Sequence, residues 1–324
     1  MNNSNFDNKL IYLLQAGLPF IPRPFAGIAA QIGVTEAEII ARIGQLQQSG
    51  LIRRLGGVFN SSSLGYRSCL CAVNVPENEI EHIEAITSPE AGVTHSYIRD
   101  GEPNFWFTYT AHHSDFESDL QDFQRRITPF KLLALSAVKK FKVQVIFDKT
   151  EVLIPATPPA QEAAPVELSA KEQNVVRLIQ GNIPASANLF ENLAFKSGFS
   201  ETELITLLAQ WRGLGILKRF AAIIRHRQFG FKGNAMCVWN VAEANVVKAG
   251  EQLAECSEVS HCYQREMLST FPYNLFAMIH AESEAEVREK FIKLSSREHL
   301  GRGRMFLSTR ELKKTSPLYF KIQK

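Results

Sequence analysis

Two short segments of the chain carry the same alternation of histidine, tyrosine and arginine. The residues are His95, Tyr97 and Arg99 in the first segment and His261, Tyr263 and Arg265 in the second. Alternate side chains of a β-strand point to the same face of a sheet, so each trio is predicted to share one face. Imidazole exchanges protons near neutral pH, and guanidinium groups bind carboxylates through paired hydrogen bonds. The pattern favours a site for an anionic ligand, and the alternative is a solvated sheet face.

A second basic cluster consists of Arg225, His226 and Arg227, the densest polar segment in the second half of the chain. Its two guanidinium groups could hold carboxylates. On a regular strand His226 would point away from both arginines, but Gly230 and Gly233 permit a turn that brings the three together. Contact with a DNA backbone is the alternative interpretation of such a segment.

The strand predicted after the second trio has two different faces. One face is apolar and suits packing against helices. The other mixes polar and large apolar side chains, namely Asn274, Phe276, Met278 and His280. Such a mixture suits a wide, flat, mainly apolar ligand with a rim of carboxylates. Packing between two sheets is the alternative, above all for Phe276 and Met278.

All these segments belong to a tandem repeat. Near the start stands the segment IAAQIGVTEAEIIARIGQLQQSGLIRR, and 165 residues further on stands the related segment LAFKSGFSETELITLLAQWRGLGILKR. The two His-Tyr-Arg trios follow at an offset of 166. A nearly constant offset over this length indicates duplication. A stretch rich in proline and alanine lies between the copies and is typical of a linker.

Each copy is predicted to begin with a winged helix-turn-helix. Thr35-x-x-Glu38 and Ser200-x-x-Glu203 are capping boxes, in which a hydroxyl accepts from an amide and the glutamate reaches back. Apolar residues follow at helical spacing. A glycine turn precedes each helix, and a pair of strands is expected after it as the wing, at 51–60 and at 216–227.

After the wing, the apolar pattern of each copy changes to the period of a strand. The predicted order is β-α-β-β-α-β, the ferredoxin-like arrangement. We therefore predict an α+β fold in which two such units form an internal pseudo-dimer with facing sheets. The expected domains are a winged helix-turn-helix at 1–66, a ferredoxin-like domain at 67–150, a linker at 151–168, a second winged helix-turn-helix at 169–231 and a second ferredoxin-like domain at 232–324.

The composition agrees with a globular protein. Of the 324 residues, 45% are hydrophobic and 21% charged, which excludes a largely disordered chain. No apolar run approaches the roughly 18 residues of a membrane helix, and the N-terminus lacks a signal-peptide pattern. Five cysteines without a Cys-x-x-Cys pair indicate reduced thiols in the cytoplasm rather than a structural metal site. Residues 1–150 hold 14 Lys and Arg against 15 Asp and Glu, and the remainder holds 22 against 18, so an anionic ligand is expected in the second half.

Four segments of the second copy resemble the siroheme decarboxylase family, whose subunits have the Lrp/AsnC architecture. They are RHRQFGF from 225 to 231, NAMCVW from 234 to 239, HCYQR from 261 to 265 and PYNLF from 272 to 276. Two subunits usually associate in that family, and this chain is similar to the fused NirD–NirL type. The first copy departs from the pattern, because Asn60, Ser61 and Ser62 replace the basic tripeptide and Thr110 replaces His280.

The resemblance implies an enzyme that removes the acetate carboxyls at ring positions 12 and 18 of siroheme. The product, 12,18-didecarboxysiroheme, would serve haem or denitrification-haem synthesis. No added cofactor is implied, because the substrate carries the iron. The implied partners are siroheme, its products and the other half of the pseudo-dimer, and a further homodimer stays open.

The same resemblance suggests roles for the candidate residues. His226 or His261 would protonate the methylene carbon left when carbon dioxide departs, or would instead ligate the substrate iron. The substrate-binding residues would be Arg225, Arg227, Tyr263, Arg265, Asn274 and His280. The trio of the first copy would contribute less, so the principal site is expected in the second copy.

Two other functions are open, a DNA-binding regulator and a tetrapyrrole sensor without turnover. A DNA-reading helix normally offers Arg, Lys, Asn or Gln near its start. The corresponding residues here are Glu36, Ala37 and Glu38 in one copy and Glu201, Thr202 and Glu203 in the other. Phosphate repels such acidic side chains, and only Arg42 and Arg212 remain as candidate contacts. DNA binding is therefore not expected.

Overall fold

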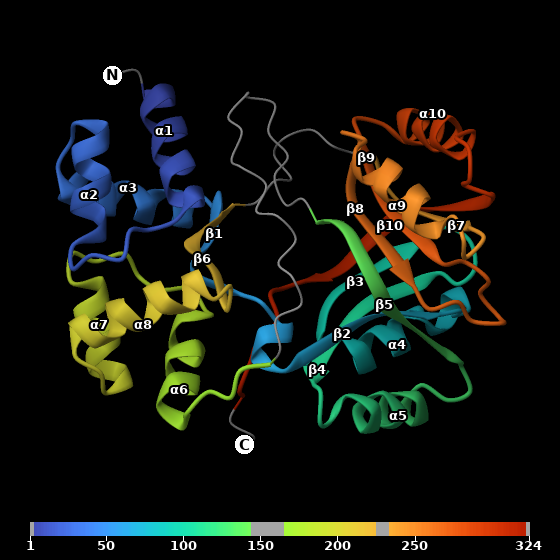
Figure 1. Ribbon diagram of the computed structural model, residues 1–324, viewed down its shortest axis with the longest axis horizontal. Coiled ribbons are helices and arrows are strands. Elements are labelled where there is room, and N and C mark those ends of the chain that lie inside the picture. The colour runs from blue at the N-terminus through green and yellow to red at the C-terminus, as the bar shows by residue number, and fades with distance from the viewer. Residues whose placement is uncertain (1–2, 144–164, 225–232, 322–324) are drawn as a thin grey trace.

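The helix-turn-helix segments of both repeats pack together around one apolar core, on the left of Figure 1. The computed structural model describes residues 3–143, 165–224 and 233–321. The helices of this body are α1 (Asn3–Ala16), α2 (Pro24–Ile32), α3 (Glu36–Gln48), α6 (Ala170–Ile179), α7 (Leu189–Ser197) and α8 (Glu201–Gly213). Both predicted capping boxes are confirmed, at Thr35 before α3 and at Ser200 before α8. Gly33 and Gly198 adopt the left-handed conformation in the preceding turns.

The wing strands form a sheet between the repeats. β1 (Ile52–Phe59) pairs antiparallel with β6 (Leu217–Ile224). The prediction that each repeat forms its own strand pair is therefore wrong for the described residues. In the first repeat the chain leaves β1 through a 3₁₀ turn, η1 (Ser62–Leu64), and goes directly to the next domain. An unpaired strand edge would leave backbone N–H and C=O groups without partners, and the equivalent strand of the other repeat supplies them.

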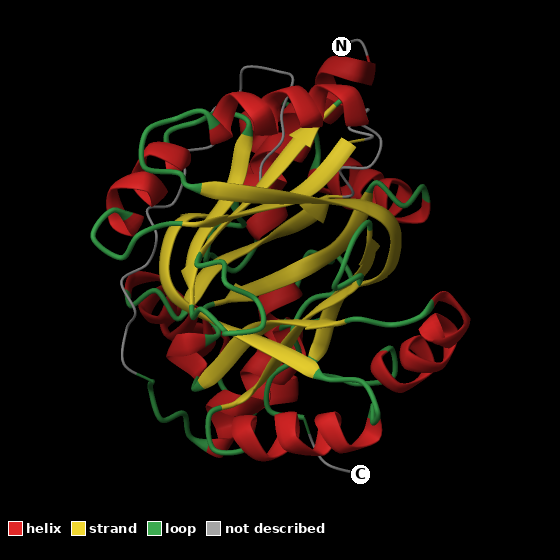
Figure 2. Ribbon diagram, turned by 90° about the vertical axis from the view of Figure 1, so that its right-hand side faces the viewer, coloured by secondary structure: helices red, strands yellow, loops and turns green. Residues whose placement is uncertain are grey.

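The strands of the two ferredoxin-like halves form one closed barrel (Figures 1 and 2). The strands are β2 (Tyr66–Val73), β3 (Val93–Arg99), β4 (Phe105–His112), β5 (Leu132–Val143), β7 (Gly233–Asn240), β8 (Val259–Arg265), β9 (Leu275–Ala281) and β10 (Arg302–Lys314). The covering helices are α4 (Ile80–Thr87), which follows the 3₁₀ turn η2 (Glu77–Glu79), α5 (Phe116–Arg126), α9 (Val246–Ala254) and α10 (Glu284–Ser295). None of the helices in the described part of the chain is long and apolar enough to cross a membrane.

The two halves share one strand order, β5-β2-β4-β3 in the first and β10-β7-β9-β8 in the second, as the duplication predicts. They are not two separate facing sheets, which corrects the sequence-based prediction. β5 pairs with β8 of the second half, and β10 pairs with β3 of the first. These strands are 12 and 13 residues long, and each has two register shifts in its pairing with the other half. Their length and local irregularity let them bend across both halves and close the barrel.

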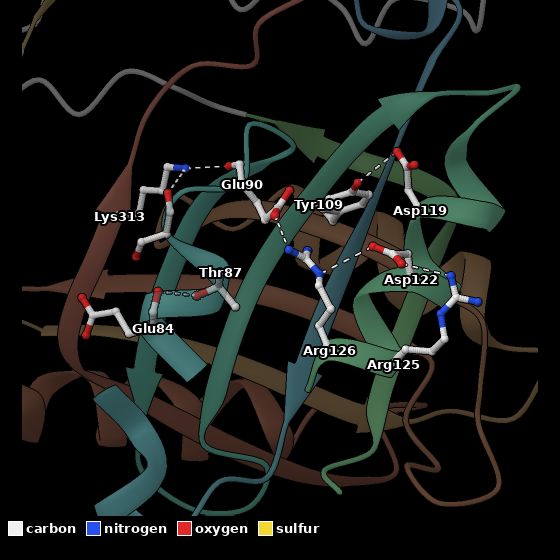
Figure 3. A network of polar contacts seen from close by, with 10 residues as sticks. Glu84, Thr87, Glu90, Tyr109, Asp119, Asp122, Arg125, Arg126 and Lys313 are labelled. Atoms are coloured by element: carbon white, nitrogen blue, oxygen red, sulfur yellow. Dashed lines mark hydrogen bonds and ion pairs between the residues drawn. The ribbon is translucent and has the colours of Figure 1, made fainter. Parts of the chain in front are cut away.

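Contacts outside the barrel hold β10 against the first half. The Lys313 ammonium donates to the backbone oxygen of Ser88 at 2.7 Å and to that of Glu90 at 2.8 Å (Figure 3). The Glu90 carboxylate in turn accepts from Arg126 of α5 at 2.6 Å. A strand of the second repeat is thus anchored to the turn and helix of the first.

The barrel interior has an apolar end and a polar end. A cluster of large side chains fills the apolar end, including Trp106, Phe271, Phe276 and Phe306. At the other end His95 lies opposite Lys314, where β10 leaves the barrel. From there the chain runs to the helical body, where Tyr319 packs against Phe59. The polar end therefore faces the helical body.

Candidate functional site in the barrel

The two His-Tyr-Arg trios lie on β3 and β8, which are opposite walls of the barrel. His261, Tyr263 and Arg265 alternate with residues buried under the outer helices, so they share the inner face as predicted. The rings of His261 and Tyr263 are nearly parallel, with centroids 6.4 Å apart. The Arg265 guanidinium lies 4.9 Å from the Tyr263 ring centroid, and Arg99 lies 5.3 Å from that of Tyr97. Both trios are therefore built in the same way.

Both arginines are buried cations, and neither forms an ion pair with a described carboxylate. Arg99 is only 5% exposed. Its Nη1 donates to the backbone oxygen of Phe306 at 3.2 Å, and Nη1 of Arg265 donates to that of Leu135 at 2.8 Å. The Nε atom of each is buried and has no hydrogen-bond partner. Burial lowers the pKa of Arg99 to about 10 and also lowers the pKa of Arg265. These guanidinium groups stay charged at neutral pH and can receive anionic groups of a ligand.

A buried serine connects two histidines of the second half. The Ser260 hydroxyl oxygen is 2.9 Å from Nδ1 of His261 and 2.9 Å from Nε2 of His280. In the first half, Nδ1 of His95 bonds the Thr94 hydroxyl at 3.0 Å in the same way. The nitrogen left for a ligand in both His95 and His261 is therefore Nε2.

The three imidazoles share one electrostatic environment. Burial, with a smaller contribution from the charge of Lys314, lowers the pKa of His95, His261 and His280 to about 4 each. His261 also lowers the pKa of the other two. Histidines of both repeats therefore lie around one region of the interior, and all three are uncharged at neutral pH. In the described ranges, no group of three or more His, Cys, Asp or Glu side chains is arranged to hold a metal ion.

The basic tripeptide Arg225, His226 and Arg227 lies outside the described residues. Its counterparts in the first repeat form a closed turn. Asn60 donates from Nδ2 to the Ser63 hydroxyl at 2.9 Å and accepts from Ser62 at 2.9 Å. Ser61 bonds the hydroxyl of Tyr319 at 2.8 Å. The first-repeat segment thus has a structural role that joins the turn to the C-terminal segment.

Asn274, expected among the substrate-binding residues, serves the backbone in this structure. It is 3% exposed, and its side chain donates to the Val241 oxygen at 2.8 Å and accepts from the Val241 amide at 2.9 Å. Asn104 makes the same pair of bonds to Val75, at 2.7 and 2.9 Å. Because both amide functions are occupied in both repeats, the geometry does not bring Asn274 into the site.

Four cations near the polar end were missed by the sequence reasoning. Arg53 of β1 donates to the Ser316 hydroxyl at 3.0 Å and lowers the pKa of His95. Lys218 of β6 is its counterpart at the offset of 165, and burial together with Lys140 of β5 lowers the pKa of Lys218. The repeated basic pairs in GLIRR and GILKR were the available signal. Lys314, the fourth, could be placed only once the path of β10 was known.

The two arginines that remained as candidates for DNA contact are engaged within the helical body. Arg42 donates from Nε to Asp7 of α1 at 2.7 Å. Arg212 lies over the ring of Phe20, 5.9 Å from its centroid, between the two repeats. Both guanidinium groups therefore contact residues of the helical body itself.

Comparisons with known proteins agree with this architecture. An AsnC-like ligand-binding domain model matches residues 63–142 and 228–313, one match in each half of the barrel. A siroheme decarboxylase NirDL-like HTH domain model matches residues 7–53. Siroheme decarboxylase of Hydrogenobacter thermophilus is 30% identical over 98% of this chain and 95% of its own length. The siroheme decarboxylase NirDL subunit of Paracoccus denitrificans is 32% identical over 89% of each chain.

Solved structures extend the similarity to the whole fold. A crystal structure of the siroheme decarboxylase NirDL matches with a TM-score of 0.77 at 30% identity and covers 98% of this chain and 94% of that one. A crystal structure of NirDL in complex with an iron-uroporphyrin III analogue also matches with a TM-score of 0.77, at 29% identity over 98% and 95% of the chains. The chain therefore belongs to the siroheme decarboxylases of the NirDL type, a family of carboxy-lyases.

Proposed function

We propose that the chain binds siroheme inside the barrel and removes the acetate carboxyls at ring positions 12 and 18. The histidines lie toward the polar end, and Arg99 and Arg265 lie deeper, beside Phe306 and Phe276 respectively. The product would be 12,18-didecarboxysiroheme, for haem or denitrification-haem synthesis. The observation that carries the proposal is the group of three uncharged imidazoles and two buried arginines inside one barrel. The NirDL structure solved with an iron-uroporphyrin III analogue supports it, since it has the same fold and holds a related ligand.

One shared site is favoured over two independent ones. The two halves act as an internal pseudo-dimer, with β3 and β8 as opposite walls of one barrel. His95 and His261 come from different repeats, and yet His261 lowers the pKa of His95. A flat macrocycle placed between these walls would contact residues of both repeats at once.

The carboxylates of siroheme would be held by cations from every side of the site. Arg99 and Arg265 lie on the barrel walls, and Lys314 lies at the rim. Arg53 and Lys218 extend the positive region onto the sheet of the helical body. Arg225 and Arg227 are proposed to add carboxylate contacts on the basis of their sequence. An arginine is most useful on a carboxylate that stays, because a clamp on the departing one would stabilise the ground state.

The reaction then needs loss of carbon dioxide and delivery of a proton. The electron pair left on the methylene carbon delocalises into the macrocycle, and a general acid protonates that carbon to give a methyl group. His261 is the described residue best placed for this role, because its Nδ1 is engaged and its Nε2 is left for the substrate. His226 is the alternative acid. The iron belongs to the substrate, and no further cofactor is proposed.

Anaerobic incubation of the purified chain with siroheme, followed by product mass, tests the proposal. Successive loss of two carbon dioxide masses is expected. Tight siroheme binding without any mass change would favour the sensor. A salt-dependent gel shift with promoter DNA and no turnover would favour the regulator, but the internal partners of Arg42 and Arg212 argue against that result.

The cellular setting and assembly are part of the same proposal. All five cysteines are free thiols, as expected in a reducing compartment such as the cytoplasm. The internal pseudo-dimer is proposed to provide both walls of the site, and whether the chain also forms a homodimer is a separate question for a measurement of its mass in solution.

A further inference from the structure

The Ser260 hydroxyl lies between two imidazoles of the proposed site. It is 2.9 Å from Nδ1 of His261 and 2.9 Å from Nε2 of His280, and Ser260 is only 3% exposed. The strands themselves hold this arrangement, because His261 of β8 pairs with Met278 of β9, two residues before His280. The hydroxyl can also donate to the Met278 backbone oxygen, at 3.4 Å, but both imidazole nitrogens are closer, at 2.9 Å.

The number of protons on a hydroxyl couples the two rings. Serine has one proton to donate and two lone pairs that accept. Ser260 can donate to only one of the two imidazole nitrogens, so the other ring must donate its N–H to the serine oxygen. When the hydroxyl gives its proton to one ring and takes one from the other, a proton passes between the rings and no charge stays on the serine.

We propose that Ser260 is a proton relay that reloads His261 from His280 during decarboxylation, which rests on the function proposed above. The bond between the methylene and carboxyl carbons breaks, and its electron pair stays with the macrocycle. The Nε2 proton of His261 moves to the methylene carbon. The Ser260 proton moves to Nδ1 of His261, and the proton of the His280 imidazolium moves to Ser260. One proton is consumed and one carbon dioxide released, with no oxidation or reduction.

Binding of the anionic substrate would favour protonation of His280, the residue from which the relay takes its proton. Burial is the main cause that lowers the pKa of His280, and the charges of Lys314, Arg99 and Lys290 add to it, as does His261 when it is protonated. Carboxylates of a bound substrate would offset those charges and favour the imidazolium form of His280. The relay therefore receives its proton when the polyanionic substrate is in place.

The first repeat provides a natural comparison without a relay. Thr94 bonds Nδ1 of His95 at 3.0 Å, as Ser260 does for His261. The position of His280 is taken by Thr110, which bonds the Ser68 hydroxyl at 2.7 Å. Among the described residues, the hydroxyl beside His95 thus orients one ring and is bonded to no second imidazole.

The test compares Ser260→Ala, Ser260→Thr and the matched control Thr94→Val in the full chain, with siroheme under anaerobic conditions. Ser260→Ala should lower kcat on the order of 10- to 100-fold, a part of what a general acid contributes. Its Kd for siroheme should stay within about threefold of the original chain. The decline of its kcat with rising pH should begin at a lower pH than in the original chain, because His261 must then take its proton from water. Ser260→Thr should restore most of the rate, and Thr94→Val should keep most of it.

His280→Gln gives an independent second measurement. It should cause a loss similar to that of Ser260→Ala, and the double variant should lose little more than either single one, because both interrupt one path. The relay is overturned if Ser260→Ala keeps the original kcat and pH profile, if the losses simply add, or if weaker siroheme binding accounts for the whole loss. A wild-type chain that does not decarboxylate siroheme would overturn the proposed function itself and is recognised before any variant is made.

Discussion

The two halves of the barrel have the same strand order but different inner walls near the helical body. In the first half Ser68 lies opposite Thr110, and the two hydroxyls bond each other at 2.7 Å. In the second half the same register places Asn234 opposite His280. His280 bonds Ser260, and the Oδ1 atom of Asn234 is buried and has no hydrogen-bond partner among the described residues. One copy has polar groups that satisfy each other, whereas the other retains hydrogen-bonding capacity for a ligand.

The two repeats also differ in the segment that precedes the first barrel strand of each half. The first repeat closes its turn with Asn60, Ser61 and Ser62, all hydrogen-bonded within the protein. The second repeat has two arginines and a histidine at the matching sequence positions. After duplication, one copy can thus take a mainly structural role while the other keeps the residues proposed to bind and convert the substrate. The difference between the copies can be tested position by position.

The largest difference is expected between His261→Ala and His95→Ala. Loss of a general acid lowers the rate on the order of 10²- to 10⁴-fold, so His261→Ala should lose that much of its kcat with siroheme. The hydroxyl partner of His95, Thr94, is bonded to no second imidazole in the part of the chain that the structure describes, and His95→Ala should lose less than about tenfold in kcat. Steady-state turnover at saturating siroheme makes the comparison. Equal losses would show that the two halves share the chemistry evenly.

Much of this comparison could be predicted from the sequence, because the features involved depend on the spacing of residues that are close together in the chain. The duplication, the capping boxes at Thr35 and Ser200 and the alternation that puts His261, Tyr263 and Arg265 on one face all follow from short-range spacing. Each of these predictions needs only a few consecutive residues.

The closure of the barrel depends on contacts that are remote in sequence. β5 and β10 bridge the halves because of their length and their register shifts, and no local pattern predicts which distant edge they meet. For the same reason Lys314 could not be placed beside His95 beforehand. Asn274 was assigned to the substrate because its motif resembled the family, whereas its side chain is used by the Val241 backbone.

The next largest effect is expected from exchanging the matching turns. The variant Arg225→Asn, His226→Ser, Arg227→Ser gives the second repeat the residues of the first. Charge-assisted hydrogen bonds contribute about 1.5–3 kcal/mol each, so one such bond lost from each arginine should weaken siroheme binding by about 10- to 100-fold per arginine. Titration of siroheme absorbance measures Kd. The variant Ser61→Ala, Ser62→Ala in the first repeat is the control and should change stability while leaving Kd within about threefold. The reverse ranking would place the carboxylate contacts in the first repeat.

A smaller effect is expected at the rim, where the halves also differ. Lys314 lies opposite His95, whereas Val143 lies opposite His261 at the matching position of β5. The ammonium disfavours the imidazolium forms, so Lys314→Met should raise the pKa of His95, His261 and His280 from about 4 toward the ordinary value. All three pKa values should stay well below the ordinary value, because burial is the larger cause. Histidine titration by NMR measures the shift.

Lys313→Met is the matched control for that shift. Lys313 is the preceding residue on β10, and its ammonium binds backbone oxygens on the outer face. Its removal should lower stability and leave the three histidine pKa values unchanged. A similar histidine shift in both variants would mean that the movement of β10, and not the charge of Lys314, is responsible.

The smallest difference is expected where the two halves are alike. Asn104 and Asn274 each bond the amide and the oxygen of one valine, Val75 and Val241 respectively. Substitution by alanine leaves both backbone groups without a partner, which costs about 1–3 kcal/mol in either half. Asn104→Ala and Asn274→Ala should therefore lower the free energy of unfolding by similar amounts in denaturant titrations. Siroheme Kd and kcat, measured well below the unfolding transition, should match the original chain in both. If Asn274→Ala alone weakened siroheme binding while its stability matched that of Asn104→Ala, Asn274 would be a ligand-binding residue after all. The two halves would then differ in function at this asparagine as well.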